Sequence, residues 1–141
     1  MTTTLLLVQT LIFAILSALH FIWAFGGTWE LDLAVPTNIA GKKVLSPTRI
    51  ESGVVAIGLG LFAVYYLALT DNMDYFPPKW VISYAGWIIP GIFLLRAVGE
   101  FRYVGFFKSI RNTAFDRLDT RYYSPLCLII ALIGFFVQYY R

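Results

Sequence analysis

The stretch that decides the fold is residues 5–25, LLLVQTLIFAILSALHFIWAF. It is an apolar run of about 21 residues, interrupted by the polar residues Gln9, Ser17 and His20. At about 1.5 Å per residue, a helix of this length covers about 30 Å, which is the thickness of the hydrocarbon core of a bilayer. We therefore expect this stretch to form a helix that crosses a membrane.

Three further apolar runs follow, at residues 50–69, 80–98 and 125–140. Hydrophobic residues make up 59% of the 141 positions and charged residues 13%, and the mean hydropathy is +0.72. A water-soluble domain of this size could not bury so much apolar surface in one core. The sequence predicts an all-α membrane protein in which residues 1–141 form one domain, a bundle of four transmembrane helices. The first run has no basic segment before it, which favours a membrane span over a cleaved signal peptide.

The basic residues indicate how the bundle is oriented. Nine of the 11 lie between the first and second runs, or between the end of the third run and the start of the fourth: Lys42, Lys43, Arg49, Arg96, Arg102, Lys108, Arg111, Arg117 and Arg121. The positive-inside rule then places both long loops in the cytoplasm and both termini outside, in the inner membrane of a bacterium. We expect an aromatic belt at the outer interface, formed by Tyr65, Tyr66, Tyr75, Phe76, Trp80, Tyr139 and Tyr140.

Two motifs predict where the outward-going helices begin. Thr48 and Glu51 have the spacing of a capping box at the start of the second run. Ser124 followed by Pro125 is typical of a helix start, with serine as the N-cap and proline in the first turn.

Small residues and a proline suggest how the helices pack. Ser52, Ala56 and Gly60 form a stripe with a spacing of four, which lets two helix backbones approach closely. We expect this stripe to pack inside the chain, with the interface of a homodimer as the alternative. Pro90 is expected to bend the third helix, either as a packing device or to open a cavity beside Trp87.

The two long loops have patterns of their own. Trp29 to Val35 alternates between apolar and polar residues, which predicts an extended segment that serves as a structured connector or as a lid. Residues 101–112 have apolar residues at helical spacing, which predicts an amphipathic helix at the interface. Its basic residues, Lys108 and Arg111, would then attract anionic lipid headgroups.

Several ionisable residues are expected at one level of the bundle, near the ends of the helices that carry the long loops. His20 lies inside the first span, where an ionisable side chain is a functional candidate, although it also fits a neutral hydrogen-bonding role. Arg96 and Glu100 are four residues apart and could pair on one helix face. The single Cys127 has neither a disulfide partner nor a CxxC motif, and the spacing of the residues supports neither a metal site nor a cofactor.

Three segments carry a resemblance to a known family. They are His20-x-x-Trp23-Ala24-x-Gly26-Gly27-x-Trp29, Arg96-Ala97-x-Gly99-x-x-Arg102-Tyr103-x-Gly105 and Asp119-Thr120-x-Tyr122-Tyr123-Ser124-Pro125. Over nearly its whole length the chain resembles a family of small four-span bacterial membrane proteins catalogued only as a domain of unknown function. The resemblance implies a compact four-helix membrane protein with these polar segments as its signature. It implies no activity.

Our first hypothesis is a site that binds, or binds and acts on, an amphiphilic molecule with an anionic head at the cytoplasmic interface. Arginine suits phosphate and carboxylate because its fork of donors can bind both oxygens. Trp23, Trp87 and a cleft near Pro90 would receive the tail. The candidate ligand-binding residues are Trp23, Trp29, Arg96, Arg102, Tyr103, Asp119, Arg121 and Tyr123.

Whether the protein is an enzyme stays open at this stage. If it is, His20 is the candidate acid or base, with Glu51 or Glu100 to orient it. One alternative is a non-catalytic subunit or assembly factor of a larger membrane complex. A weaker alternative is a small transporter that works as a dimer. The expected partners are membrane lipids, the anionic amphiphile, and a second copy or a larger membrane complex, but no nucleic acid.

Overall fold

The computed structural model describes residues 2–28, 31–44, 47–70 and 78–141. Its elements in chain order are α1 (Thr2–Ala24), α2 (Leu31–Ala34), α3 (Arg49–Ala68), α4 (Lys79–Val98), α5 (Ala114–Leu118), the π-helical turn η1 (Asp119–Tyr123) and α6 (Ser124–Tyr140). The described residues form no strand. Their one β-type pairing is an isolated bridge between Thr37 and Lys43. The predicted all-α class is confirmed.

Four helices are long and apolar enough to cross a membrane. They are α1, α3, α4 and the composite helix from Ala114 to Tyr140 that α5, η1 and α6 form together. Many of their apolar side chains face outward. Ile50 is 80% exposed, and Leu11 and Leu61 are 62% and 63% exposed, as expected for surfaces that contact lipid. The protein is a multi-pass membrane protein.

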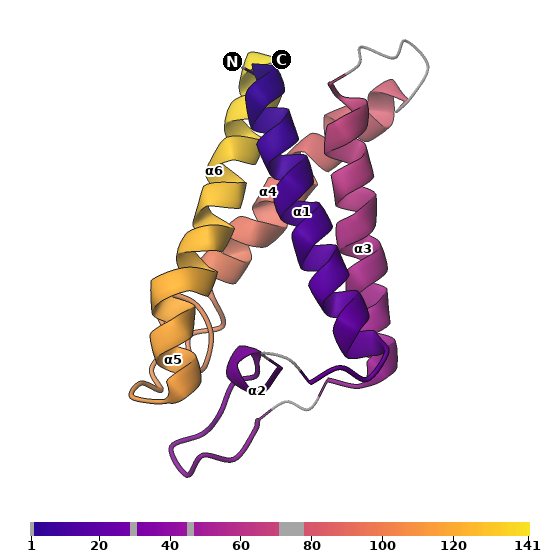
Figure 1. The fold of residues 1–141 in the computed structure, drawn as a ribbon. Coiled ribbons are helices and arrows are strands. Elements are labelled where there is room, and N and C mark those ends of the chain that lie inside the picture. The colour runs from indigo at the N-terminus through magenta and orange to yellow at the C-terminus, as the bar shows by residue number, and fades with distance from the viewer. Residues whose placement is uncertain (1, 29–30, 45–46, 71–77) are drawn as a thin grey trace.

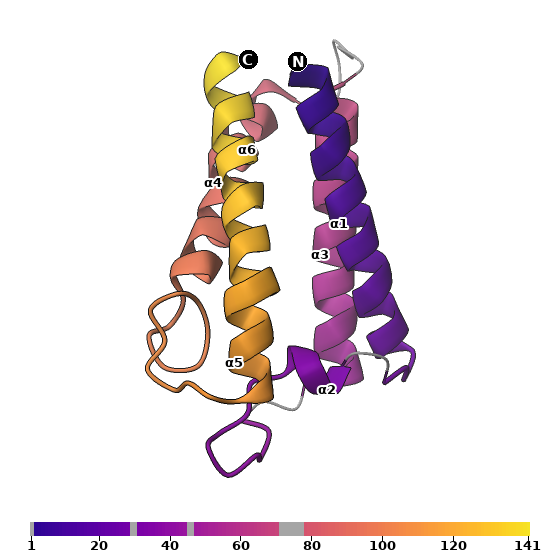
Figure 2. The ribbon, with the colours of Figure 1, turned by 60° about the vertical axis from the view of Figure 1, so that its left-hand side comes forward.

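The long helices form two pairs. In Figures 1 and 2, α1 lies beside α3, and α4 lies beside α6. Both termini lie at one end of the bundle, and the described parts of the two long loops, residues 25–28, 31–44 and 47–48 and residues 99–113, lie at the other. We call the second end the loop end. In Figure 1, α1 and α6 diverge toward the loop end.

The predicted stripe of small residues packs inside the chain. Ser52 and Ala56 are buried, and the Ser17 hydroxyl on α1 donates to the Ala56 carbonyl at 2.7 Å. A Cβ atom on Gly60 would lie 3.2 Å from the Ser17 Oγ atom. The stripe is therefore the surface where α3 meets α1.

Pro90 is a packing residue of the other pair. It lies inside α4, which runs unbroken from Lys79 to Val98, and it is buried. A Cβ atom on Gly134 of α6 would lie 2.8 Å from the Pro90 Cβ. The glycine thus makes room for the proline ring, so α4 and α6 approach closely at this level.

The core is aromatic at mid-bundle. Phe13 is fully buried, and its ring lies 5.2–5.6 Å from those of Phe62, Tyr66 and Phe93. Tyr65 and Tyr66 are also buried, so the prediction that these two tyrosines belong to an interfacial belt is wrong. Trp80, Tyr139 and Tyr140 are exposed as the belt requires, whereas Tyr75 and Phe76 lie outside the described residues.

The capping box at the start of α3 is confirmed. The Thr48 Oγ1 atom accepts from the Glu51 backbone N–H at 3.2 Å, and the Glu51 carboxylate accepts from the Thr48 N–H at 2.6 Å. Each side chain satisfies a backbone donor that the first turn of the helix leaves without a partner.

The α-helix α6 begins at Ser124 with Pro125 in its first turn, as predicted, but Ser124 is not an N-cap and the fourth span does not begin there. The chain is helical from Ala114, and Thr113 is the N-cap, with its hydroxyl accepting from the Asp116 N–H at 3.0 Å. Ser124 instead follows the π-helical turn, where its backbone N–H bonds to the Asp119 carbonyl five residues earlier. Pro125 has no N–H to continue the ordinary ladder, so a change of hydrogen-bond pattern beside it is physically reasonable.

The prediction of an amphipathic helix over residues 101–112 is also wrong. The structure describes all of residues 99–113, and none of them is helical. The backbone folds back on the end of α4 through a hydrogen bond from the Phe106 N–H to the Ala97 carbonyl at 2.9 Å. Gly99 and Gly105 have positive φ angles of 87° and 90°, and a Cβ atom on either would collide with the backbone beside the other. We call residues 99–113 the folded loop.

The first long loop differs from the extended segment that its alternation predicted. Leu31–Ala34 forms the short helix α2, whose first N–H bonds back to the Thr28 carbonyl at 3.1 Å. Trp29 and Glu30 lie outside the described residues. Alternation over so few residues does not distinguish a strand from a helical turn.

Candidate functional site

A cavity of about 460 Å³ lies between the two helix pairs, towards the loop end. This volume is within the range typical of sites for one small molecule. Most of its wall is apolar. All four long helices and α2 contribute to it, through Leu16, Leu19, His20, Trp23, Ala34, Val55, Gly58, Leu59, Phe62, Ile92, Phe93, Arg96, Tyr123, Leu126 and Cys127. We call it the central cavity.

His20 lies on the α1 wall of the central cavity. Its Nδ1 atom is 2.8 Å from the Leu16 carbonyl oxygen, and its ring packs edge-on against Trp23 with centroids 4.7 Å apart. A carbonyl oxygen only accepts, so Nδ1 carries the proton, and Nε2 is the atom that can accept one. The helix itself therefore orients the imidazole.

Arg96 lies in the last turn of α4 and lines the central cavity from the opposite side. Its Nη2 atom donates to Asp119 Oδ1 at 3.0 Å. Its Nη1 atom is buried and has no hydrogen-bond partner among the described residues. A buried guanidinium N–H without an acceptor is costly. The Arg96 side chain as a whole is 34% exposed, so its accessible part is the cationic surface that the cavity offers to an anionic group.

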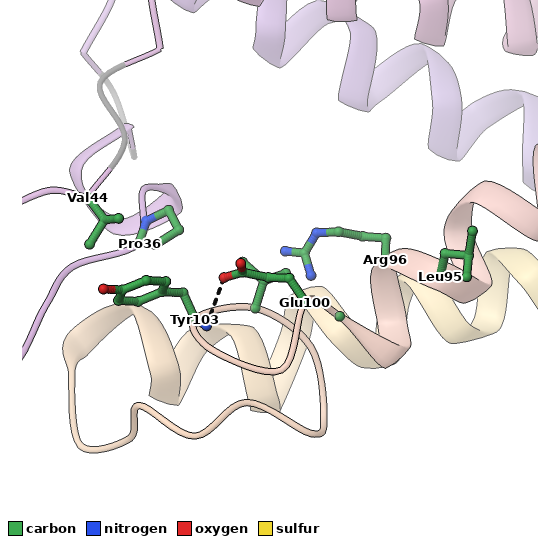
Figure 3. A pocket seen from close by; sticks show the side chains of 8 residues that line it. Pro36, Val44, Leu95, Arg96, Glu100 and Tyr103 are labelled. Carbon is green, nitrogen blue, oxygen red and sulfur yellow. Dashed lines mark hydrogen bonds between the residues drawn. The ribbon is translucent and has the colours of Figure 1, made fainter.

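Arg96 also lines a second pocket, which is open and has a volume of about 700 Å³. Figure 3 shows Arg96 and Glu100 along this pocket, with Tyr103 near Pro36 and Val44 of the first long loop. The Glu100 carboxylate accepts from the Tyr103 N–H at 2.9 Å. Arg96 therefore stands where a mostly apolar cavity meets an open pocket at the loop end.

Asp119 holds Arg96 in place. It is fully buried, and its Oδ2 atom accepts from the Gly105 N–H at 2.9 Å and from Lys108 Nζ at 2.8 Å. Lys108 also reaches Asp116 at 3.2 Å. This charged cluster, Arg96, Lys108, Asp116 and Asp119, joins α4, the folded loop and the π-helical turn.

The cluster corrects two predictions. Lys108 has a side chain that is only 1% exposed, so it serves the fold and does not face lipid headgroups. Arg96 pairs with Asp119 and not with Glu100, because α4 ends at Val98 and the helical spacing is lost before residue 100.

Neither glutamate is placed to orient His20. The Glu51 carboxylate is exposed and bonds to its own capping residue. Glu100 is exposed and bonds to the backbone of the folded loop. Of the three candidate catalytic residues, His20 alone lines the central cavity.

The candidate ligand-binding residues are divided between the cavity and the surface. Trp23, Arg96 and Tyr123 line the central cavity, and Tyr103 lines the open pocket. Arg102 and Arg121 are exposed and lie over the rings of the adjacent Tyr103 and Tyr122, at 5.2 and 5.4 Å. Trp29 lies outside the described residues.

Trp87 is not among the residues that line the central cavity. It is half exposed and packs against Phe135 of α6, with ring centroids 5.9 Å apart. The central cavity lies between the helix pairs, and Pro90 is not among its lining residues either.

Sequence reasoning missed much of the apolar wall, including Gly58, Phe62, Phe93 and Leu126. Every span is apolar on all sides, so no pattern separates residues that face a cavity from those that face lipid. Asp116 was missed as the partner of the Thr113 cap, although the spacing Thr113-x-x-Asp116 is itself typical of a helix start.

A comparison with models of protein families gives a match whose range includes the three polar segments. The model of a family described as "Protein of unknown function (DUF3995)" covers residues 13–134. The chain belongs to this family. The match confirms the resemblance to a family of unknown function, and the four apolar helices agree with a small membrane protein family. No curated protein and no solved structure matches the chain.

In the part of the chain that the structure describes, no three His, Cys, Asp or Glu side chains are close enough together to hold a metal ion. The side chains of His20, Trp23, Arg96, Tyr123 and Cys127 supply the polar and reactive groups around the central cavity, and the rest of its wall is apolar.

Proposed function

We propose that the protein binds an amphiphilic molecule with an anionic head in the central cavity. The head would lie at the loop end beside Arg96 and His20, and the tail would lie against the apolar wall. With the positive-inside rule, the loop end faces the cytoplasm of a bacterium, so the ligand would enter from the cytoplasmic leaflet.

One observation carries the proposal: a single cavity combines the Arg96 guanidinium at its loop end with an apolar wall along the rest. Arg96 Nη2 is bonded to Asp119, which fixes the guanidinium beside the cavity. Arg96, Lys108, Asp116 and Asp119 together carry no net charge. The attraction for an anion therefore depends on close contact with the Arg96 guanidinium.

The position of His20 in the central cavity also suits it to proton transfer. His20 is the group in the cavity that suits acid or base catalysis, because an imidazole can both accept and donate a proton through its ring nitrogens. The Leu16 carbonyl orients the ring in place of a carboxylate. If the protein acts on its ligand, His20 would exchange a proton with the head through Nε2.

The proposal predicts that filling the cavity abolishes binding. Gly58 lines the cavity, and nothing lies within 4 Å of a Cβ atom built on it. Gly58→Leu should thus fill the tail site without disturbing the fold and lower binding of octyl phosphate at least about tenfold. Native mass spectrometry of the protein in nanodiscs would measure this binding.

Gly91→Leu is the matched control. Gly91 is also helical with open space around a Cβ atom, but it is not among the residues that line the cavity. It should bind octyl phosphate as wild type does. Equal binding by the wild type and both variants would contradict the proposal. A second protein chain in the spectra would favour the subunit alternative, for which the small-residue stripe offers no free surface because α1 covers it.

A further inference from the structure

The central cavity has a definite depth. Its lining residues on α1 run from Leu16 to Trp23, and those on α3 run from Val55 to Phe62. Seven residues of helix correspond to about 10 Å at about 1.5 Å per residue. The two independent helices give the same depth, measured from the loop end towards the middle of the bundle.

The deep end of the cavity is closed by aromatic rings. Phe62 and Phe93 line it, and Phe13 packs edge-on against both from behind, at 5.6 and 5.2 Å. Tyr66 stacks on the far face of this group, with its ring 5.6 Å from that of Phe13. One turn beyond Phe13, Gln9 Nε2 donates to the Ile130 carbonyl at 2.8 Å and ties α1 to α6. The bundle is thus filled beyond the rings.

We propose that this aromatic group makes the site selective for chain length, so that it prefers an anionic amphiphile with a chain of about eight carbons. The inference rests on the proposed function and names the ligand class within it. An extended chain advances about 1.2 Å per backbone bond, so a depth of about 10 Å accommodates about eight carbons beyond the head. Phe62 and Phe93 are the specificity-determining residues, because a longer chain meets their rings.

The experiment is a competition between chain lengths. Octyl, dodecyl and hexadecyl phosphate are mixed in equal amounts into phosphatidylcholine nanodiscs that hold the protein, and native mass spectrometry records which of them is bound. Wild type should favour octyl over hexadecyl phosphate by at least about fivefold, because extra methylene groups forced against a filled core are disfavoured. Phe62→Leu and Phe62→Ala should lower this preference at least about threefold.

Phe136→Ala is the matched control. Phe136 is a partly buried residue of α6 that packs on Tyr140 at 4.5 Å and does not line the cavity. It should keep the wild-type preference. The distribution of each phosphate between water and bilayer is common to all variants and cancels when their preferences are compared. The milder Phe62→Leu keeps the test valid if Phe62→Ala does not fold.

The outcomes separate the two proposals. No bound alkyl phosphate of any length in wild type would overturn the proposed function, and the length selection with it. Equal binding of all three lengths, or a preference that survives both Phe62 variants, would overturn the length selection alone. In that case longer chains would leave the cavity sideways, past Val55 and Ile92, which are 45% and 46% exposed.

Discussion

Asp119→Ala is expected to lower the free energy of unfolding by about 3–5 kcal/mol, the usual cost of removing one partner from a buried ion pair. Asp119 is fully buried and accepts from three donors, Arg96 Nη2, Lys108 Nζ and the Gly105 N–H. Its loss leaves Arg96 without its counter-ion and a buried backbone donor without an acceptor. Thermal and denaturant unfolding in detergent, followed by circular dichroism, would measure the change.

Two variants serve as controls for this prediction. Asp119→Asn keeps an acceptor but removes the charge, and it should fall between wild type and Asp119→Ala. Arg111→Ala removes an exposed charge of the same loop and should change stability by less than about 0.5 kcal/mol. If Asp119→Ala were no more harmful than Arg111→Ala, the charged cluster would not be the element that holds the folded loop.

Gly105→Ala is expected to destabilise the protein by more than about 3 kcal/mol, for two separate reasons. Its φ of 90° lies in a region that costs an alanine about 1–2 kcal/mol. A Cβ atom there would also collide with the Val98 carbonyl oxygen and with the backbone of Gly99. Because Gly105 also donates its N–H to Asp119, a shift of the backbone would weaken the charged cluster as well.

Gly41→Ala separates the two reasons. Gly41 has a φ of 75°, but nothing lies within 4 Å of a Cβ atom built on it. It should therefore show the backbone cost alone, about 1–2 kcal/mol in the same unfolding measurement. The difference between the two variants is the cost of the collision. Equal effects of Gly41→Ala and Gly105→Ala would mean that the folded loop accommodates the added methyl group without a further loss of stability.

The sequence predicts local features of this protein well. Residues 5–25 identify a membrane helix because length and hydropathy are properties of one segment, and Thr48 with Glu51 identifies a helix start because a cap involves only neighbours. The level shared by His20 and Arg96 was also predicted, and the structure places both on one cavity. These features need no knowledge of contacts between distant segments.

The errors arise where distant contacts decide. Lys108 has the sequence context of a surface residue, but Asp116 and Asp119 draw it into the interior. Apolar residues at helical spacing favoured a helix over residues 101–112, whereas the close approach of Gly99 and Gly105 fixes a compact loop. No local pattern reports that two glycines six residues apart will touch.

The same limit applies to the candidate site. Arg96, Arg102 and Arg121 look alike in the sequence, yet only Arg96 lines the central cavity. Arg102 and Arg121 lie over neighbouring tyrosine rings on the surface. Which arginine faces the cavity depends on how α4 and the composite helix are rotated about their own axes. Packing between the helices sets that rotation.

The most direct test of the central claim uses Cys127, the single cysteine of the chain, which lines the central cavity. The rate of its alkylation by a maleimide would be measured with octyl phosphate and with octanol, which has the same chain but no charge. At ten times its Kd, octyl phosphate should slow the reaction roughly tenfold by simple occupancy, and octanol at the same concentration should slow it far less. Equal protection by the two compounds, or none by either, would contradict an anionic-amphiphile site in this cavity.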